Sequence, residues 1–155
     1  MKIIFLDIDW VMVKFPNSNT KSRAEKVTNI NQYVFDNNLI NNLKKVLEKT
    51  NARIVISSSW RHNMERVRDA FYDANLDWNL VIWKTPDNLW YWRWNEILSY
   101  INDWHKNNIY SITHWVVLDD DDFDLKCISR LWKLIKTNPE VWFIEVEKAI
   151  ELLNN

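Results

Sequence analysis

Acidic side chains follow two apolar segments of the chain. The stretch FLDIDW places Asp7 and Asp9 one residue apart at the end of an apolar run, and WVVLDDDD places Asp119–Asp122 at the end of another. Between these segments, the run ARIVI is followed by Ser57–Ser59. Converging carboxylates raise one another's pKa unless a cation offsets their charge. The residue types therefore predict a cation site built from oxygen ligands.

Such a set suits phosphoryl transfer. Mg²⁺ prefers oxygen ligands, retains waters and accepts phosphate oxygens. One carboxylate can attack phosphorus to give an aspartyl-phosphate, and a second, two residues on, points to the same side of an extended strand and can protonate the leaving oxygen. A hydroxyl and a cationic side chain would hold the non-bridging oxygens. Each set alone has an ordinary explanation as a turn, a cap or a solvated acidic loop, so the conjunction carries the prediction.

The order of elements would bring these sets to one edge. Apolar runs predict strands at 2–6, 52–56, 80–82, 114–118 and 133–137, and amphipathic segments predict helices at 36–49, 63–75, 95–106 and 146–153. This alternation predicts an α/β fold, a Rossmann-like three-layer sandwich with a parallel sheet of about five strands and helices on both faces. Ligands of such sheets bind beyond the carboxyl ends of the strands.

Length and composition restrict the class of protein. The 155 residues predict one domain, 1–155, in which the polar segment 14–35 forms a loop or flap and any cap is minimal. Lys plus Arg (20) nearly balance Asp plus Glu (21), which argues against binding nucleic acid by bulk charge. The single cysteine, Cys127, fits a reducing compartment, and no apolar stretch approaches a membrane span. A cytoplasmic protein is expected.

The chain has no glycine and 11 tryptophans. Average usage predicts roughly 11 glycines in this length. Several tryptophans lie where the chain should turn, at positions that favour glycine because it reaches positive φ without a Cβ penalty. One interpretation is that these positions are glycine in the parent sequence, through codon reassignment or substitution. The other is a natural Trp-rich protein. The turn tryptophans are Trp78, Trp83, Trp90, Trp92, Trp94 and Trp142, whereas Trp60, Trp104 and Trp115 fit as genuine tryptophans.

The order of motifs resembles the haloacid dehalogenase-like (HAD) phosphohydrolases, which have hhhhDxD, a Ser or Thr, a Lys or Arg, and an acidic pair. The blocks IVISSSWRHNMERVRDAF, RWNEILSYI, VVLDDDDF and LIKTNPEVWF look like the HAD domain of Swiss Army Knife RNA repair proteins. The resemblance implies a Mg²⁺-dependent phosphatase with an aspartyl-phosphate intermediate. Its phosphorylated substrate would be RNA ends or nucleotides, because a site without a large cap suits an exposed terminal phosphate. A small metabolite phosphate is the alternative.

The resemblance also implies roles for individual residues. Asp7 would be the nucleophile and Asp9 the general acid/base. Ser57 would bind the transferred phosphoryl group, with Ser58 as the alternative. Asp119 and Asp120 would hold Mg²⁺ together with Asp7 and the backbone carbonyl of Asp9. The third-motif cation is assigned to Arg93 in preference to Lys84, and Arg61 and His62 would contact substrate, although His62 also fits an exposed residue at a helix start.

Two other hypotheses compete with this one. The family usually has glycine after the second aspartate, and Trp10 departs from that pattern, as Trp92 and Trp94 do around the third motif. These departures favour a degenerate, non-catalytic HAD-like module that binds phosphate or a partner. A receiver domain of the response-regulator type is also phosphorylated on aspartate, but it needs an acceptor after the third strand, where LVIWKTP has none.

Overall fold

Five parallel strands form one sheet in the order β3-β2-β1-β4-β5. The computed structural model describes residues 1–9, 11–13, 35–87, 92–107, 110–121, 125, 132–137 and 145–155. The strands are β1 (Lys2–Leu6), β2 (Arg53–Ile56), β3 (Val81–Lys84), β4 (His114–Asp119) and β5 (Leu134–Lys136). The helices are α1 (Asn37–Thr50), α2 (Met64–Asp73), α3 (Arg93–Asn107) and α5 (Val146–Asn154), with short 3₁₀ turns η2 (Ser59–His62) and η3 (Trp78–Leu80).

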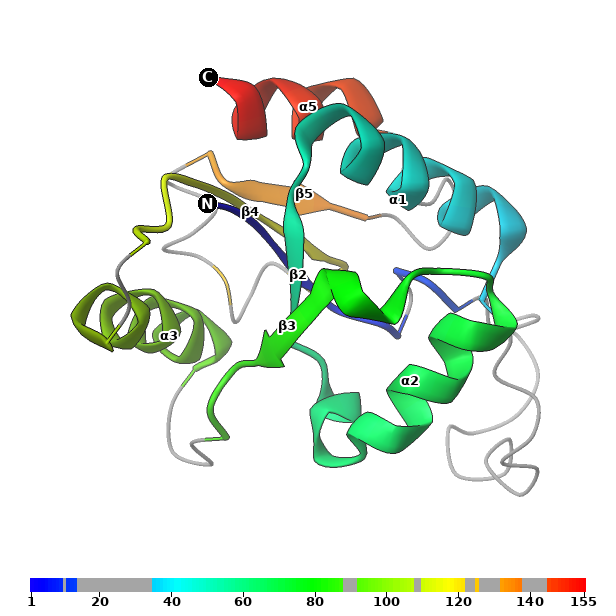
Figure 1. Cartoon of the computed structure of the whole chain (residues 1–155), viewed down its shortest axis with the longest axis horizontal. Helices are drawn as coiled ribbons and strands as arrows, with labels where there is room; N and C mark the ends of the chain where they lie inside the picture. Colours follow the sequence, from blue (N-terminus) through cyan, green and yellow to red (C-terminus); the bar gives the residue numbers. More distant parts are fainter. Residues whose placement is uncertain are drawn as a thin grey trace.

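The central strand β1 is buried on both faces. Its even-numbered residues, Ile4 and Leu6, belong to the hydrophobic cluster that contains residues of α1, α2 and α5. Its odd-numbered residues, Ile3 and Phe5, belong to the cluster on the face covered by α3. Successive side chains of a strand point to opposite faces, so one short strand joins both halves of the core. Figure 1 shows the resulting layers, with α1 and α5 on one side of the sheet and α3 on the other.

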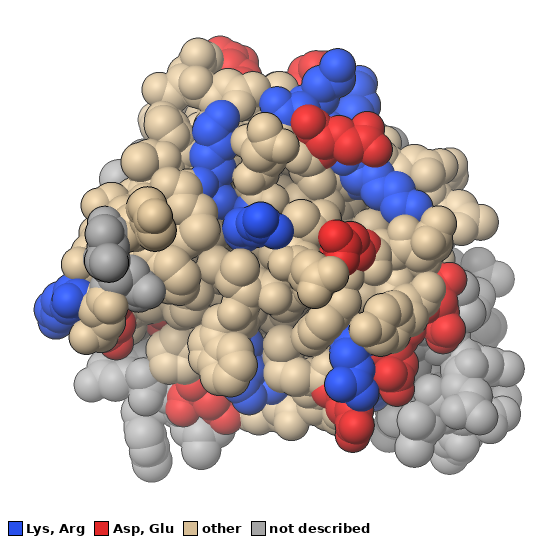
Figure 2. Space-filling view, in the orientation of Figure 1, with Lys and Arg blue, Asp and Glu red and all other residues tan. Residues whose placement is uncertain are grey.

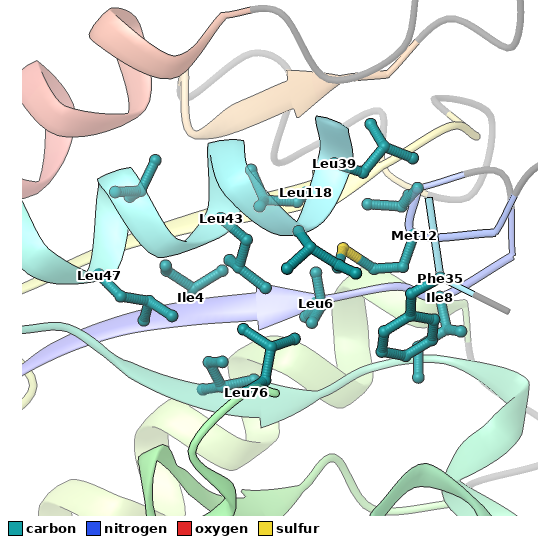
Figure 3. Close-up of a cluster of buried hydrophobic side chains, with 14 of the residues drawn as sticks. Ile4, Leu6, Ile8, Met12, Phe35, Leu39, Leu43, Leu47, Leu76 and Leu118 are labelled. Carbon is teal, nitrogen blue, oxygen red and sulfur yellow. The ribbon is translucent and has the colours of Figure 1, made fainter. Parts of the chain in front are cut away.

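Helix α1 shows how the sequence builds one of these layers. The side chain of Asp36 accepts hydrogen bonds from the backbone N–H groups of Asn38 and Leu39 and so begins the helix. Its buried face carries Leu39, Leu43 and Leu47, spaced four residues apart, and Figure 3 shows Leu43 and Leu47 between α1 and β1. The helix ends at Asn51, whose φ of 54° is the left-handed conformation that asparagine adopts more readily than most residues.

The predicted fold class is confirmed. Every expected strand and helix is present, and α3 begins two residues earlier than expected, at Arg93. The segment 14–35, expected as a loop or flap, lies outside the described residues except for Phe35, which pairs with Val13 in an antiparallel bridge. No helix in the described part of the chain is long and apolar enough to cross a membrane. On the face drawn in Figure 2, basic and acidic residues are scattered among uncharged ones.

Positive φ angles locate the backbone strain among the described residues. Asn51, Asn75 and Trp132 have positive φ, whereas Trp92 and Trp94 do not. The expectation of left-handed backbone strain is therefore wrong for Trp92 and Trp94. It applies to Trp132, whose φ is 58° and which is 79% exposed. A bulky residue at such a φ is a genuine outlier. Trp10, Trp90 and Trp142 lie outside the described residues.

We expect Trp132→Gly to raise the free energy of unfolding by about 1 kcal/mol, because glycine adopts this φ without a Cβ clash and the exposed ring contributes little packing. Urea denaturation measures the change. Trp78→Gly is the matched control: Trp78 packs edge-on against Phe71 at 5.7 Å between ring centroids, so the same substitution should destabilise. Equal effects of the two substitutions would contradict the assignment of strain to position 132.

Candidate active site

A polar residue stands at the carboxyl end of every strand. The backbone ladder continues for one residue beyond four of the strands: Ser57 N–H donates to Leu6 O at 2.9 Å, Thr85 N–H to Ile56 O at 2.9 Å, Asp7 N–H to Leu118 O at 3.0 Å, and Thr137 N–H to Asp119 O at 2.9 Å. These hydrogen bonds fix the polar positions relative to one another along one edge of the sheet, where ligands of open α/β sheets bind. In spatial order the residues are Thr85, Ser57, Asp7, Asp120 and Thr137.

Three carboxylates converge at the centre of this edge. One oxygen from each of Asp7, Asp119 and Asp120 lies within 4.8 Å of the other two. Asp7 is 4% exposed and Asp119 is fully buried. Asp119 is two residues beyond Val117, which packs on the α3 face of the sheet, so strand alternation directs it to that same face. Asp120 is half-buried, so the cluster combines two buried carboxyl groups with a third that is partly exposed.

Arg93 lies against this cluster from the first turn of α3. Its Nη1 is 2.6 Å from Asp119 Oδ2 and 3.5 Å from Asp7 Oδ1. Helix α3 reaches this place because Ile97 and Ile101 bury their side chains on the sheet, which brings the start of the helix over the strand ends. Lys84, the alternative cation, donates instead to the backbone carbonyl of Arg61 at 2.8 Å. Of these two cations, Arg93 is the one that contacts the carboxylates.

Burial raises the pKa of all three carboxyls, and the charges of neighbouring aspartates raise it further. Burial raises the pKa of Asp7 well above its ordinary value, and the charge of Asp119 raises it further, while Arg93 and a hydrogen bond from Ser58 lower it. Burial raises the pKa of Asp119 to about 6 against the opposing charge of Arg93. Burial also raises the pKa of Asp120. Arg93 therefore offsets only part of the negative charge of the ionised cluster, and three carboxylate oxygens at this spacing fit a hard divalent cation.

The two candidate serines lie differently. Ser58 hydrogen-bonds Asp7, and its Oγ also accepts from the backbone N–H of Trp60 at 3.3 Å. Ser57 is fully buried, and its Oγ has no hydrogen-bond partner among the described residues. The serine whose hydroxyl touches Asp7 is therefore Ser58, the second choice from the sequence. The phosphoryl-binding role of either serine stays a prediction.

The side chain of Asp9 is not one of the three that cluster, although its charge raises the pKa of Asp120. Oδ1 of Asp9 accepts a hydrogen bond from Trp60 Nε1 at 3.0 Å. Sequence reasoning missed this contact, although one signal was available: Ser58 and Trp60 are two residues apart, as Asp7 and Asp9 are, and the two pairs follow neighbouring parallel strands. Two such segments can run side by side, so that Ser58 meets Asp7 and Trp60 meets Asp9.

Arg61 and His62 follow directly in η2. The Arg61 guanidinium, 10% exposed, lies 3.0 Å from Glu96 Oε1 and 3.4 Å from Asp87 Oδ1, and also donates to Ser58 O at 3.2 Å. His62 is exposed and lies 3.2 Å from Asp87. Arg61 thus joins the serine segment to α3, and its predicted contact with substrate stays a prediction. Glu96, which sequence reasoning also missed, is 3% exposed and is the main buried partner of Arg61.

A protein-family model described as the HAD domain in Swiss Army Knife RNA repair proteins matches residues 3–147. The chain belongs to this family. Neither a curated protein nor a solved structure matches it. Membership makes the chain a HAD-like phosphohydrolase domain in general terms, and proteins of this class act on phosphorylated substrates. HAD domains typically use a metal ion, and the Asp7, Asp119 and Asp120 cluster offers a place for one.

Replacing Glu96 with glutamine should destabilise this HAD domain by about 3 kcal/mol, because it leaves a buried guanidinium without its main counter-charge. Urea denaturation measures the loss. The control is Glu147→Gln, which breaks an exposed pair with Lys45 and should cost about 0.5 kcal/mol or less. A loss at Glu96 no greater than at Glu147 would show that the Arg61 pair does not hold the segment.

The stability of the cation-free HAD domain should fall as pH rises from about 4 to about 6. Asp119 titrates at 3.8 when unfolded and at about 6 when folded, so below 3.8 it is protonated in both states and above about 6 the folded state holds an unfavourable charge. The melting temperature is measured in chelator across this range. At neutral pH, Mg²⁺ should restore stability by binding the ionised cluster.

The control for this prediction is Asp119→Asn, which cannot ionise. Its melting temperature should depend less on pH over this range than that of the wild type, and Mg²⁺ should stabilise it less. Parallel pH profiles for the two proteins would show that the buried charge of Asp119 does not limit stability.

Proposed function

We propose that this HAD domain is a Mg²⁺-dependent phosphatase that forms an aspartyl-phosphate on Asp7. The observation that supports this most directly is the gathering of the Asp7, Asp119 and Asp120 oxygens within 4.8 Å, at the carboxyl edge of a parallel sheet. Asp7, Asp119, Asp120 and the backbone carbonyl of Asp9 would hold the cation. When bound, Mg²⁺ would offset the cluster's charge, favour the ionised form of Asp7 and bind phosphate oxygens.

In the first step, an oxygen of Asp7 forms a bond to phosphorus while the bond from phosphorus to the leaving oxygen breaks. Protonated Asp9 gives its proton to the leaving oxygen, which departs as an alcohol. In the second step, water attacks phosphorus, Asp9 takes the proton of the water, and the bond from phosphorus to Asp7 breaks. Inorganic phosphate leaves and both carboxyl groups return to their starting state.

The remaining contacts suit the non-bridging oxygens of the phosphoryl group. The Ser58 hydroxyl already lies against Asp7, and Arg93 Nη1 lies 3.5 Å from the same carboxylate. A hydroxyl donor and a guanidinium beside the nucleophile can stabilise charge on the oxygens around phosphorus as it is attacked. Ser58 therefore takes the place in this proposal that the sequence assigns first to Ser57.

The proposed substrate is a terminal phosphate of RNA or of a nucleotide. The family description, from RNA repair proteins, supports this class. The chain has 20 basic and 21 acidic residues. This near balance fits recognition of a terminal phosphate better than non-specific binding along the RNA backbone, which needs net positive charge.

Asp7→Asn should lower turnover by at least about a thousandfold while the fold persists, because an amide does not attack phosphorus as a carboxylate does. Phosphate release is measured with p-nitrophenyl phosphate and with RNA oligonucleotides carrying a 5′- or 3′-phosphate, in Mg²⁺ and in chelator. Asp69→Asn, on the exposed side of α2, is the matched control and should keep wild-type activity. Circular dichroism checks the fold.

The outcomes separate the parts of the proposal. A rate for Asp7→Asn within about tenfold of wild type would show that Asp7 is not the nucleophile. Full activity in the presence of a chelator would show that the reaction does not need a cation. If RNA ends react with no higher kcat/KM than p-nitrophenyl phosphate, the proposed substrate class is contradicted, whereas the proposed phosphatase activity is not. Binding of phosphate without turnover by the wild-type protein would favour the non-catalytic module instead.

A further inference from the structure

Trp60 joins the serine segment to the second aspartate of the site. It lies in η2, just after β2, and β2 is the parallel neighbour of β1, the strand that precedes Asp9. The indole Nε1–H donates to Asp9 Oδ1 at 3.0 Å, and the Trp60 residue is only 9% exposed. A buried, rigid side chain therefore contacts a partly exposed carboxyl group.

Contacts on several sides hold the indole in place. The backbone N–H of Trp60 donates to Ser58 Oγ at 3.3 Å, and its carbonyl accepts from Asn63 N–H at 2.9 Å. The guanidinium carbon of Arg66 lies 4.0 Å from the centre of the Trp60 ring, within the range of a cation–π contact. Because Ser58 also touches Asp7, the same short segment contacts both aspartates of the pair.

The chemistry of the indole defines what this contact can do. An indole N–H only donates a hydrogen bond and has no site that accepts a proton. Oδ1 of Asp9 must therefore accept, whether the carboxyl group is ionised or protonated, and the proton of the acid form is directed to Oδ2. A general acid works only when its proton lies within hydrogen-bond reach of the leaving oxygen. The fixed indole donor on Oδ1 selects both the orientation of Asp9 and the oxygen that carries its proton.

We propose that Trp60 is a positioning residue that holds Asp9 so that Oδ2 delivers its proton to the leaving group. This role rests on the phosphatase function proposed above, because it acts through the general acid of that reaction. It predicts that loss of the indole N–H harms the reaction in proportion to how much the leaving group needs a proton.

The test uses Trp60→Phe, which removes the N–H and keeps an aromatic ring beneath Arg66. kcat/KM is measured for phosphate esters ranging from p-nitrophenyl phosphate, which has a good leaving group, to alkyl phosphates, whose alkoxides leave only when protonated. We expect a loss below about threefold for p-nitrophenyl phosphate and about a hundredfold for alkyl phosphates, within the range of general acid catalysis. In Asp9→Asn, adding Trp60→Phe should cause no further loss for alkyl phosphates.

Trp104→Phe is the matched control. It also removes an indole hydrogen bond, from Nε1 to the carbonyl of Tyr110 at 2.7 Å, but on α3 about 16 Å along the helix axis from Arg93. It should leave every ester unchanged. A second measurement needs no activity: in Asp9→Asn, the ¹⁵N–¹H resonance of the Trp60 indole should shift, whereas that of Trp104 should not.

Each result tests a different part of the inference. An equal loss for all leaving groups in Trp60→Phe would mean a structural role and would overturn the positioning of Asp9. An unmoved Trp60 indole resonance in Asp9→Asn would overturn the contact itself, and this readout decides alone if Trp60→Phe does not fold. A wild-type protein that hydrolyses none of the esters overturns the proposed phosphatase and this role with it, whereas an active enzyme with uniform losses overturns only the role of Trp60.

Discussion

The repulsion among three carboxylates in a buried place is the constraint around which this protein is arranged. Asp7 and Asp119 are buried and Asp120 is half-buried, and burial together with the charges of neighbouring aspartates raises the pKa of all three carboxyls. Such an arrangement persists only when the surrounding structure holds it firmly. The backbone ladder between β1 and β4, which continues to Asp7, supplies that hold.

The packing of α3 is the second part of the same arrangement. Its apolar face lies on the odd-numbered residues of β1 and on β4, and the first turn then reaches the carboxylates with Arg93. Glu96, one turn further on, holds Arg61 and through it the backbone of Ser58. The core and the site therefore share one helix: its hydrophobic side sets its position, and its first turns supply a cation to the cluster and an anion to the serine segment.

Much of this can be predicted from the sequence, because it depends on patterns with a fixed period. Apolar runs give the strands, and the parallel order places Asp7 and Asp119 at one edge without any knowledge of side-chain contacts. The segments beyond the strand ends are harder to predict, because strand alternation stops there. Whether Ser57 or Ser58 meets Asp7 depends on the 3₁₀ turn η2, and the partners of Arg61 and Trp60 come from segments distant in sequence. The positive φ of Trp132 likewise cannot be predicted from the residue type, because tryptophan does not favour this backbone conformation.

The position of β1 between β2 and β4 has a consequence for how the chain acquires its site. Asp7 and Asp119 are more than a hundred residues apart in sequence, so the cluster is the closing point of a very long loop. The entropy of closing that loop must be overcome before the carboxylates meet, and parallel pairing of this range is slow to form. A chain in which β1 and β2 have paired but β4 has not yet docked would carry Asp7 and Ser58 in place and would still lack the cluster. Cation binding would thus follow the docking of β4 on β1, and a bound cation would stabilise the closed loop between Asp7 and Asp119.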